Sequence, residues 1–187
     1  MNANKSIVEM VMNTISFGLV NQFNAYGATT PFVAVISNVD AAMEFEFVRG
    51  GENFFLNGQH GLIQLRQFCQ DTLSDRDGSV IGVLLAREGW IHQLRADQQP
   101  VQERSVVIIF AMKDGNNYSR ILPIDAETRQ IKYQPCGFES HLNQSIVGQF
   151  TGGELRNDAS AVPLNAEDAL QDGFLLSDVH PEPPGLH

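Results

Sequence analysis

The sequence predicts an α+β fold in a single domain, with a mainly antiparallel sheet of about five strands packed with two helices. Three extended apolar runs follow one another over residues 80–124, separated only by short, turn-rich gaps. Another pair of strand-like runs lies upstream, and a helical pattern precedes each group. Because strands and helices do not alternate strictly, the order favours α+β over a doubly wound parallel sheet.

The first predicted element is a helix over residues 6–26, where apolar residues recur every three or four positions. Asn13, Ser16 and Asn21 fall off this stripe. The predicted buried residues are Val8, Val11, Ile15, Leu19, Phe23 and Tyr26, with Met12 beside them.

Two strands follow at residues 31–37 and 42–49, joined by a turn at residues 38–41. The second strand alternates: Met43, Phe45 and Phe47 share one parity, and Glu44 and Glu46 share the other. We therefore expect one dry side and one wet side on this strand.

The second helix is predicted over residues 61–73 and ends at an Asp and Gly cluster. Its predicted buried stripe comprises Leu62, Leu65, Cys69 and Leu73, widened by Ile63 and Phe68.

The last three predicted strands form a meander over residues 79–94, 104–113 and 118–124. The first begins as a continuous apolar run and later alternates. The second is apolar at both parities, as in a central strand whose two faces both need cover. Pro123 cannot donate to a ladder, so the third strand is expected at an edge.

Length and charge divide the 187 residues into a domain at 1–150 and an acidic, proline-containing extension at 151–187. The extension carries seven acidic residues and one basic residue. A helix over residues 166–176, with Asn165 as N-cap, is expected inside it. The extension either keeps the protein soluble or suits a basic partner.

The net charge of −10 argues against binding to nucleic acid or to an anionic membrane, since both depend on basic residues meeting phosphate. No apolar stretch has the length of a membrane span or the pattern of a signal peptide. Two cysteines do not form a disulfide framework, so a reducing cytoplasm is expected. No motif indicates a metal or another cofactor.

The main candidate site consists of Glu88, Trp90 and His92. These residues alternate along the predicted strand, so their side chains lie on the same face. A carboxylate, an indole and an imidazole together can bind a ligand, with Glu88 or His92 as base and Trp90 as an apolar wall. The alternative is that Trp90 caps the core and that the two polar side chains are simply solvated.

Two weaker candidates lie elsewhere. Cys136, Glu139 and His141 place a thiol near an imidazole, as a nucleophile and its base or as two ligands of a metal. Their spacing matches no structural zinc pattern, and a Cys-His enzyme normally draws its pair from distant parts of the chain. The glycine-rich stretch at residues 49–61 lacks the lysine of a phosphate loop and any G-x-G-x-x-G. Its Phe54, Phe55 and Leu56 indicate local packing or an exposed contact patch instead.

Residues 85–124 carry Glu88 and Trp90 on one strand, Pro100 and the pair Glu103 and Arg104 before the next, and Asp114 before the third. This stretch resembles a loose group of small uncharacterised bacterial and phage proteins. The resemblance implies the strand meander and no function.

These observations favour a non-catalytic soluble protein that binds another protein or forms a homodimer. The sheet has more apolar surface than two helices are expected to cover, and the acidic extension suits a basic partner. The alternative is a small-molecule-binding protein or hydrolase-type enzyme with a pocket around Glu88, Trp90 and His92. Regulation of a phage or plasmid process through the acidic surface is a third possibility.

Overall fold

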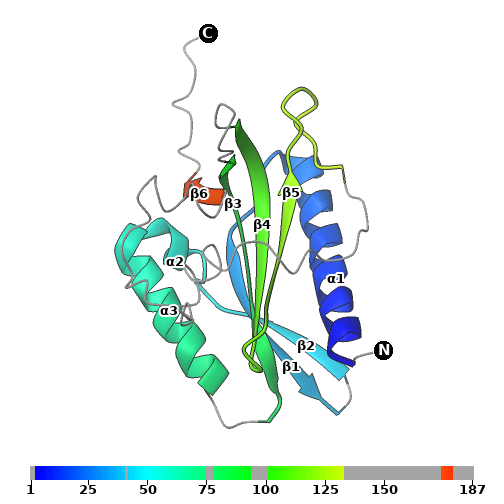
Figure 1. Ribbon diagram of the computed structural model, residues 1–187, viewed down its shortest axis with the longest axis vertical. Helices are drawn as coiled ribbons and strands as arrows, with labels where there is room; N and C mark the ends of the chain where they lie inside the picture. Colours follow the sequence, from blue (N-terminus) through cyan, green and yellow to red (C-terminus); the bar gives the residue numbers. More distant parts are fainter. Residues whose placement is uncertain (1–2, 41, 75–77, 94–100, 133–173, 179–187) are drawn as a thin grey trace.

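The computed structural model describes residues 3–40, 42–74, 78–93, 101–132 and 174–178 of the chain. Helices and strands follow one another in the order helix, two strands, two helices, three strands and a last short strand (Figure 1). Their bounds are α1 Ala3–Tyr26, β1 Phe32–Val39, β2 Ala42–Phe47, α2 Asn53–Leu56, α3 Gly58–Ser74, β3 Val80–Gln93, β4 Val101–Met112, β5 Asn117–Pro123 and β6 Phe174–Asp178.

The strands form one antiparallel sheet in the order β2-β1-β3-β4-β5, which confirms the predicted α+β class. β5, which ends at Pro123, lies at one end of this order, as the sequence predicts. β1 pairs with β3 only as far as Ala86, which lies opposite Phe32, the first residue of β1. β6 pairs with β3 over Gly89 to Gln93, beyond this start of β1. β2 is the outermost strand on the other side.

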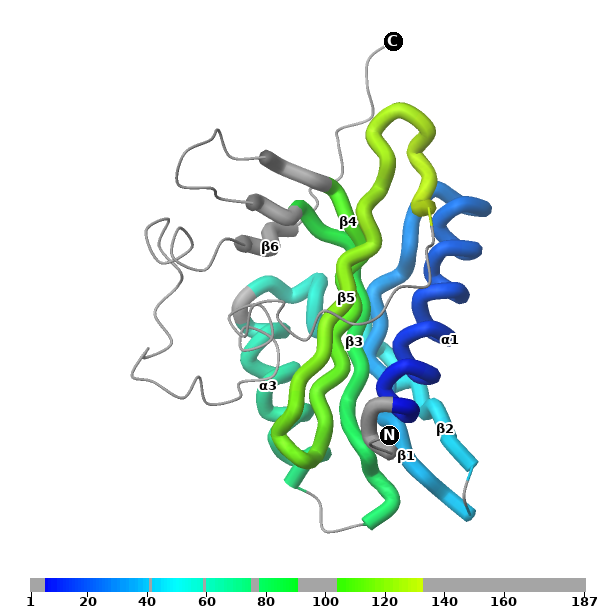
Figure 2. The backbone as a smooth tube through the Cα atoms, turned by 45° about the vertical axis from the view of Figure 1, so that its right-hand side comes forward, coloured from blue at the N-terminus to red at the C-terminus, as the bar shows by residue number. Residues whose placement is uncertain are grey.

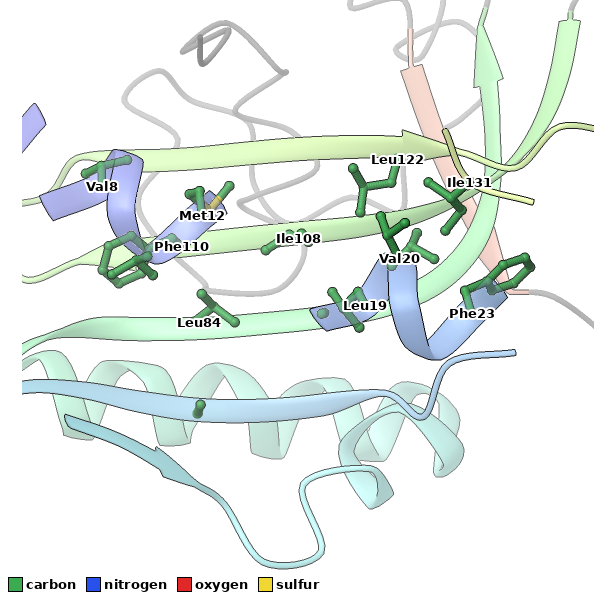
Figure 3. Close-up of a cluster of buried hydrophobic side chains, with 14 of the residues drawn as sticks. Val8, Met12, Leu19, Val20, Phe23, Leu84, Ile108, Phe110, Leu122 and Ile131 are labelled. Atoms are coloured by element: carbon green, nitrogen blue, oxygen red, sulfur yellow. The ribbon is translucent and has the colours of Figure 1, made fainter. Parts of the chain in front are cut away.

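Helices cover both faces of the sheet: α1 lies on one face, and α2 and α3 lie on the other (Figures 1 and 2). Even-numbered side chains of β3 and β4, such as Leu84 and Ile108, pack against α1. Odd-numbered ones, such as Val83 and Val107, pack against α3. Strands apolar at both parities therefore fill two cores, which confirms the prediction that both faces need cover. Figure 3 shows the larger core, where α1 meets β3, β4 and β5.

The predicted stripe of α1 is largely confirmed, with two corrections. Tyr26 is 82% exposed rather than buried, because the helix ends there: Gly27 has φ +73° and its N–H donates to the Phe23 carbonyl at 2.7 Å. Ser16 is fully buried although it falls off the predicted stripe. Its hydroxyl donates to the Met12 carbonyl at 2.6 Å, which satisfies the polar group inside the core.

On α3, Leu65 and Cys69 are buried as predicted, but Ile63 is exposed because it lies on the side of the helix away from the sheet. The glycine-rich stretch before α3 contains the short helix α2. Phe54 and Phe55 pack on the α3-side core and Leu56 is exposed, so both expectations for this stretch are met in part.

The predicted helix at residues 166–176 is wrong at its C-terminal end, since residues 174–176 belong to β6. The β-branched and aromatic residues expected of a strand are few there, but the free side of β3 offers backbone partners. Residues 166–173 lie outside the described part of the chain.

Candidate functional site

An open crevice of about 280 Å³ lies between α1 and the β1–β2 side of the sheet. Helix residues form one wall, and the start of β1 and the end of β2 form the other. Its lining is mostly apolar and consists of Thr14, Ile15, Gly18, Leu19, Gln22, Thr30, Phe32 and Phe47. A concave apolar surface with a few polar groups is typical of a binding site.

The crevice is open because hydrogen bonds hold α1 over the β5 side of the sheet. Arg120 of β5 is 7% exposed, and its Nη1 donates to Asn13 Oδ1 at 2.9 Å and to Ser16 Oγ at 3.0 Å. Near the C-terminal end of the helix, Asn24 exchanges two hydrogen bonds with the backbone of Ile131, at 2.8 and 3.1 Å. Both attachments hold α1 over β4 and β5, which leaves the β1–β2 side of this face less covered.

Gly18 lies in the helix wall of the crevice. A Cβ at this position would meet no atom within 4 Å. Glycine inside a helix costs about 0.5–1 kcal/mol relative to alanine, and a small side chain would fit at this position of the wall.

Two aromatic rings form the sheet wall. The rings of Phe32 and Phe47 meet edge to face with centroids 5.2 Å apart. Phe47 remains 58% exposed. Met43 and Phe45 of the same strand are half-buried against the α1-side core, whereas Glu44 and Glu46 are exposed on the opposite face. The predicted dry and wet sides of β2 are therefore confirmed, although the dry side is only partly covered.

The predicted site residues lie away from this crevice. Glu88 and Trp90 have the parity of Leu84 and Ala86, on the α1 face of β3, and are opposite Val106 and Arg104 of β4. His92 continues the same register opposite Gln102, but its side chain lies outside the described part. None of the three lines the crevice.

The carboxylate of Glu88 forms an ion pair with Arg104. Its Oε1 accepts a hydrogen bond from Nε of Arg104, and the Glu88 side chain is 12% exposed. The Arg104 guanidinium lies 5.9 Å from the centroid of the Phe23 ring, at the C-terminal part of α1. This arrangement ties β3, β4 and α1 together. Trp90 is half-buried and lies opposite Arg104 in the β3–β4 register.

The cysteine in the described part of the chain is not a reactive thiol. Burial raises the pKa of the Cys69 thiol to about 12, which suppresses the reactive thiolate. Among the described residues, no group of three or more His, Cys, Asp or Glu is placed to hold a metal ion. Cys136, Glu139 and His141 lie outside those residues.

Within the described ranges, none of the helices is both long enough and apolar enough to span a membrane.

Comparison with known proteins assigns no family: no family model matches the chain, and no curated protein and no solved structure matches it significantly.

The crevice was missed by sequence reasoning, although two signals for it are present. Gly18 interrupts the middle of a helical pattern, and Phe47 stands at the end of an alternating strand. Neither signal predicts which side of α1 stays uncovered by the sheet, because that depends on the hydrogen bonds of α1 with Arg120 and Ile131.

Proposed function

We propose that this protein acts without catalysis, by binding another protein or a second copy of itself through the crevice between α1 and the β1–β2 side of the sheet. The observation that supports the proposal is the incompletely covered apolar surface there, with Phe47 58% exposed at the rim. Exposed apolar surface beside polar residues is characteristic of interaction sites, and aromatic side chains are enriched in them.

Two further features support binding over catalysis. Glu88 is engaged with Arg104, and the only cysteine in the described part is buried with a raised pKa. The alternative is a small-molecule-binding protein or hydrolase-type enzyme with a pocket around Glu88, Trp90 and His92. It has less support, because the crevice is lined by none of these residues.

Substitution Gly18→Glu tests the proposal. It places a long charged side chain in the crevice at a position where the helix has room, so the fold should persist. Gln64→Glu is the matched control, because it adds the same charge to an exposed position of α3 on the other face of the sheet.

The measurements are light scattering coupled to size-exclusion chromatography, and affinity purification of tagged full-length protein from the cells that produce it. We expect an associated protein, either foreign or a second copy, that is lost with Gly18→Glu and retained with Gln64→Glu. If wild type and Gly18→Glu have the same molar mass and the same associated proteins, the proposal is wrong.

A further inference from the structure

We infer that the partner adds a β-strand to the free edge of β2, and that this strand alternates apolar and basic residues. The inference rests on the proposed function and names the class of partner. β2 is the last strand in the sheet order, and no strand of the described ranges pairs with its outer side. An edge strand with unpaired backbone groups is a template for another strand.

The backbone groups that β2 offers follow from its register with β1. The N–H of Val48 donates to the carbonyl of Val33 at 2.8 Å. Hydrogen-bonded and non-hydrogen-bonded pairs alternate in an antiparallel ladder, so Glu46 and Glu44, opposite Val35 and Ser37, also bond inward to β1.

It follows that the intervening residues Met43, Phe45 and Phe47 direct their N–H and C=O groups outward, away from β1. An added strand would meet a regular set of three donors and three acceptors. Its residues opposite these three would lie on the same face as their side chains, next to α1 and the crevice. Apolar residues are required there.

The opposite face of β2 sets the charge of the partner. Residues 32–52 contain the acidic residues Asp40, Glu44, Glu46 and Glu52 and one basic residue, Arg49. Glu44 and Glu46 are exposed on the face away from α1. Residues directly opposite them on an added strand would be close enough for ion pairing, so lysine or arginine is favoured there.

The same charges argue against a second copy at this edge. A two-fold axis that pairs β2 with another β2 in antiparallel fashion keeps each face on the same side, so it places the Glu44 and Glu46 face of one copy beside that of the other. Centred on Phe45, for example, this pairing sets Glu44 opposite Glu46 in both halves. Like charges directly opposite each other are destabilising, so the edge repels its own copy and accepts a basic strand.

Three synthetic peptides of eight residues test the inference against full-length protein by fluorescence anisotropy. One alternates valine and lysine, the second has the same composition with four valines followed by four lysines, and the third alternates valine and glutamate. We expect the alternating lysine peptide to bind at least about tenfold more tightly than either of the others, because only it matches both faces of β2.

The double substitution Glu44→Lys with Glu46→Lys should reverse the preference, so that the glutamate peptide binds better than the lysine peptide. Glu127→Lys, at an exposed position of the hairpin after β5, is the control and should leave the preference unchanged. Amide exchange supplies a second readout: the lysine peptide should slow exchange at Met43, Phe45 and Phe47 by about tenfold or more, as expected for newly paired amides.

Equal binding of the two lysine-containing peptides, or an unchanged preference after the double substitution, would overturn strand addition. Self-association of wild type that slows exchange at the three outward amides would also overturn it, in favour of a second copy. The proposed function is judged separately: if Gly18→Glu removes the native partner while the double substitution retains it, the crevice binds protein but the β2 edge does not.

Discussion

Replacement of Ser16 by alanine should destabilise the protein, because the Ser16 hydroxyl connects α1 with β5. The hydroxyl donates to the Met12 carbonyl and accepts from Nη1 of Arg120, and both Ser16 and Arg120 are buried. Loss of a hydrogen bond to a charged group costs about 1.5–3 kcal/mol. Alanine regains up to about 0.7 kcal/mol through helix propensity. We therefore expect a net loss of about 1–2 kcal/mol in the free energy of unfolding.

Urea denaturation of the full-length protein measures this loss, and thermal unfolding provides a check. For a chain of 150–250 residues, 1 kcal/mol shifts the melting temperature by about 2–4 °C, so the expected decrease is about 2–8 °C. Thr14→Ala on the exposed side of the same helix is the control and should gain a few tenths of a kcal/mol through propensity alone. If Ser16→Ala behaves like Thr14→Ala, the attachment of α1 to Arg120 contributes nothing and the explanation of the crevice fails.

Three further predictions concern the rest of the fold. Gly82→Ala should lower the free energy of unfolding by about 1–3 kcal/mol in urea, because its Cβ would lie 2.4 Å from the Ala111 carbonyl oxygen on β4; stability equal to wild type would refute that contact. With the second cysteine replaced by serine, native Cys69 should resist a thiol reagent at pH 8 and react once unfolded, since burial raises its pKa to about 12; rapid native labelling would contradict this. NMR titration should give Asp125 a pKa below its ordinary value, chiefly because the backbone N–H of Thr128 donates to its carboxylate at 2.8 Å. The charged carboxylate then stabilises the fold, and this contribution is lost as pH falls through the lowered pKa; Asp125→Asn should remove this pH-dependent part of the free energy of unfolding.

The raised pKa of Cys69 also determines how the free energy of unfolding changes with pH. Above pH 9.0 the Cys69 thiol ionises in the unfolded state but stays neutral in the folded state. The unfolded state therefore binds fewer protons than the folded state. Stability should therefore fall as pH rises from 9.0, the ordinary pKa of the thiol, to the folded value of about 12, by about 1.4 kcal/mol per pH unit at most. The difference between wild type and Cys69→Ala, measured in urea at pH 8 and pH 10, isolates this contribution.

Much of the fold follows from local patterns. The order of α1, α3 and the first five strands, the two-sided burial of β4 and the alternation of β2 can all be predicted, because each depends on the period of apolar residues within one element; the four-residue helix α2 is too short to show such a period. β6 could not be predicted in this way. Its pairing depends on where β1 begins along β3, which no local pattern of the five residues of β6 encodes.

The candidate site depends more on contacts between distant residues. Arg120 donates to Ser16 across 104 positions of the chain, and this hydrogen bond joins two buried polar side chains of β5 and α1. Sequence reasoning placed Glu88 and Trp90 on one face, as the register has them, but could not show that Arg104 binds the Glu88 carboxylate. The alternation on β2 was visible, whereas its free outer edge becomes evident only from the strand order.

Site-specific photo-crosslinking from position 47 tests the central claim most directly. A benzophenone amino acid replaces Phe47 at the rim of the crevice, and a control protein carries it at Ile63, which is similarly exposed on α3 across the sheet. Irradiation of cells that produce each protein should give a crosslinked protein of defined mass from position 47 and not from position 63. If position 47 gives no adduct, or if both positions give the same adducts, the crevice between α1 and the β1–β2 side is not the binding surface.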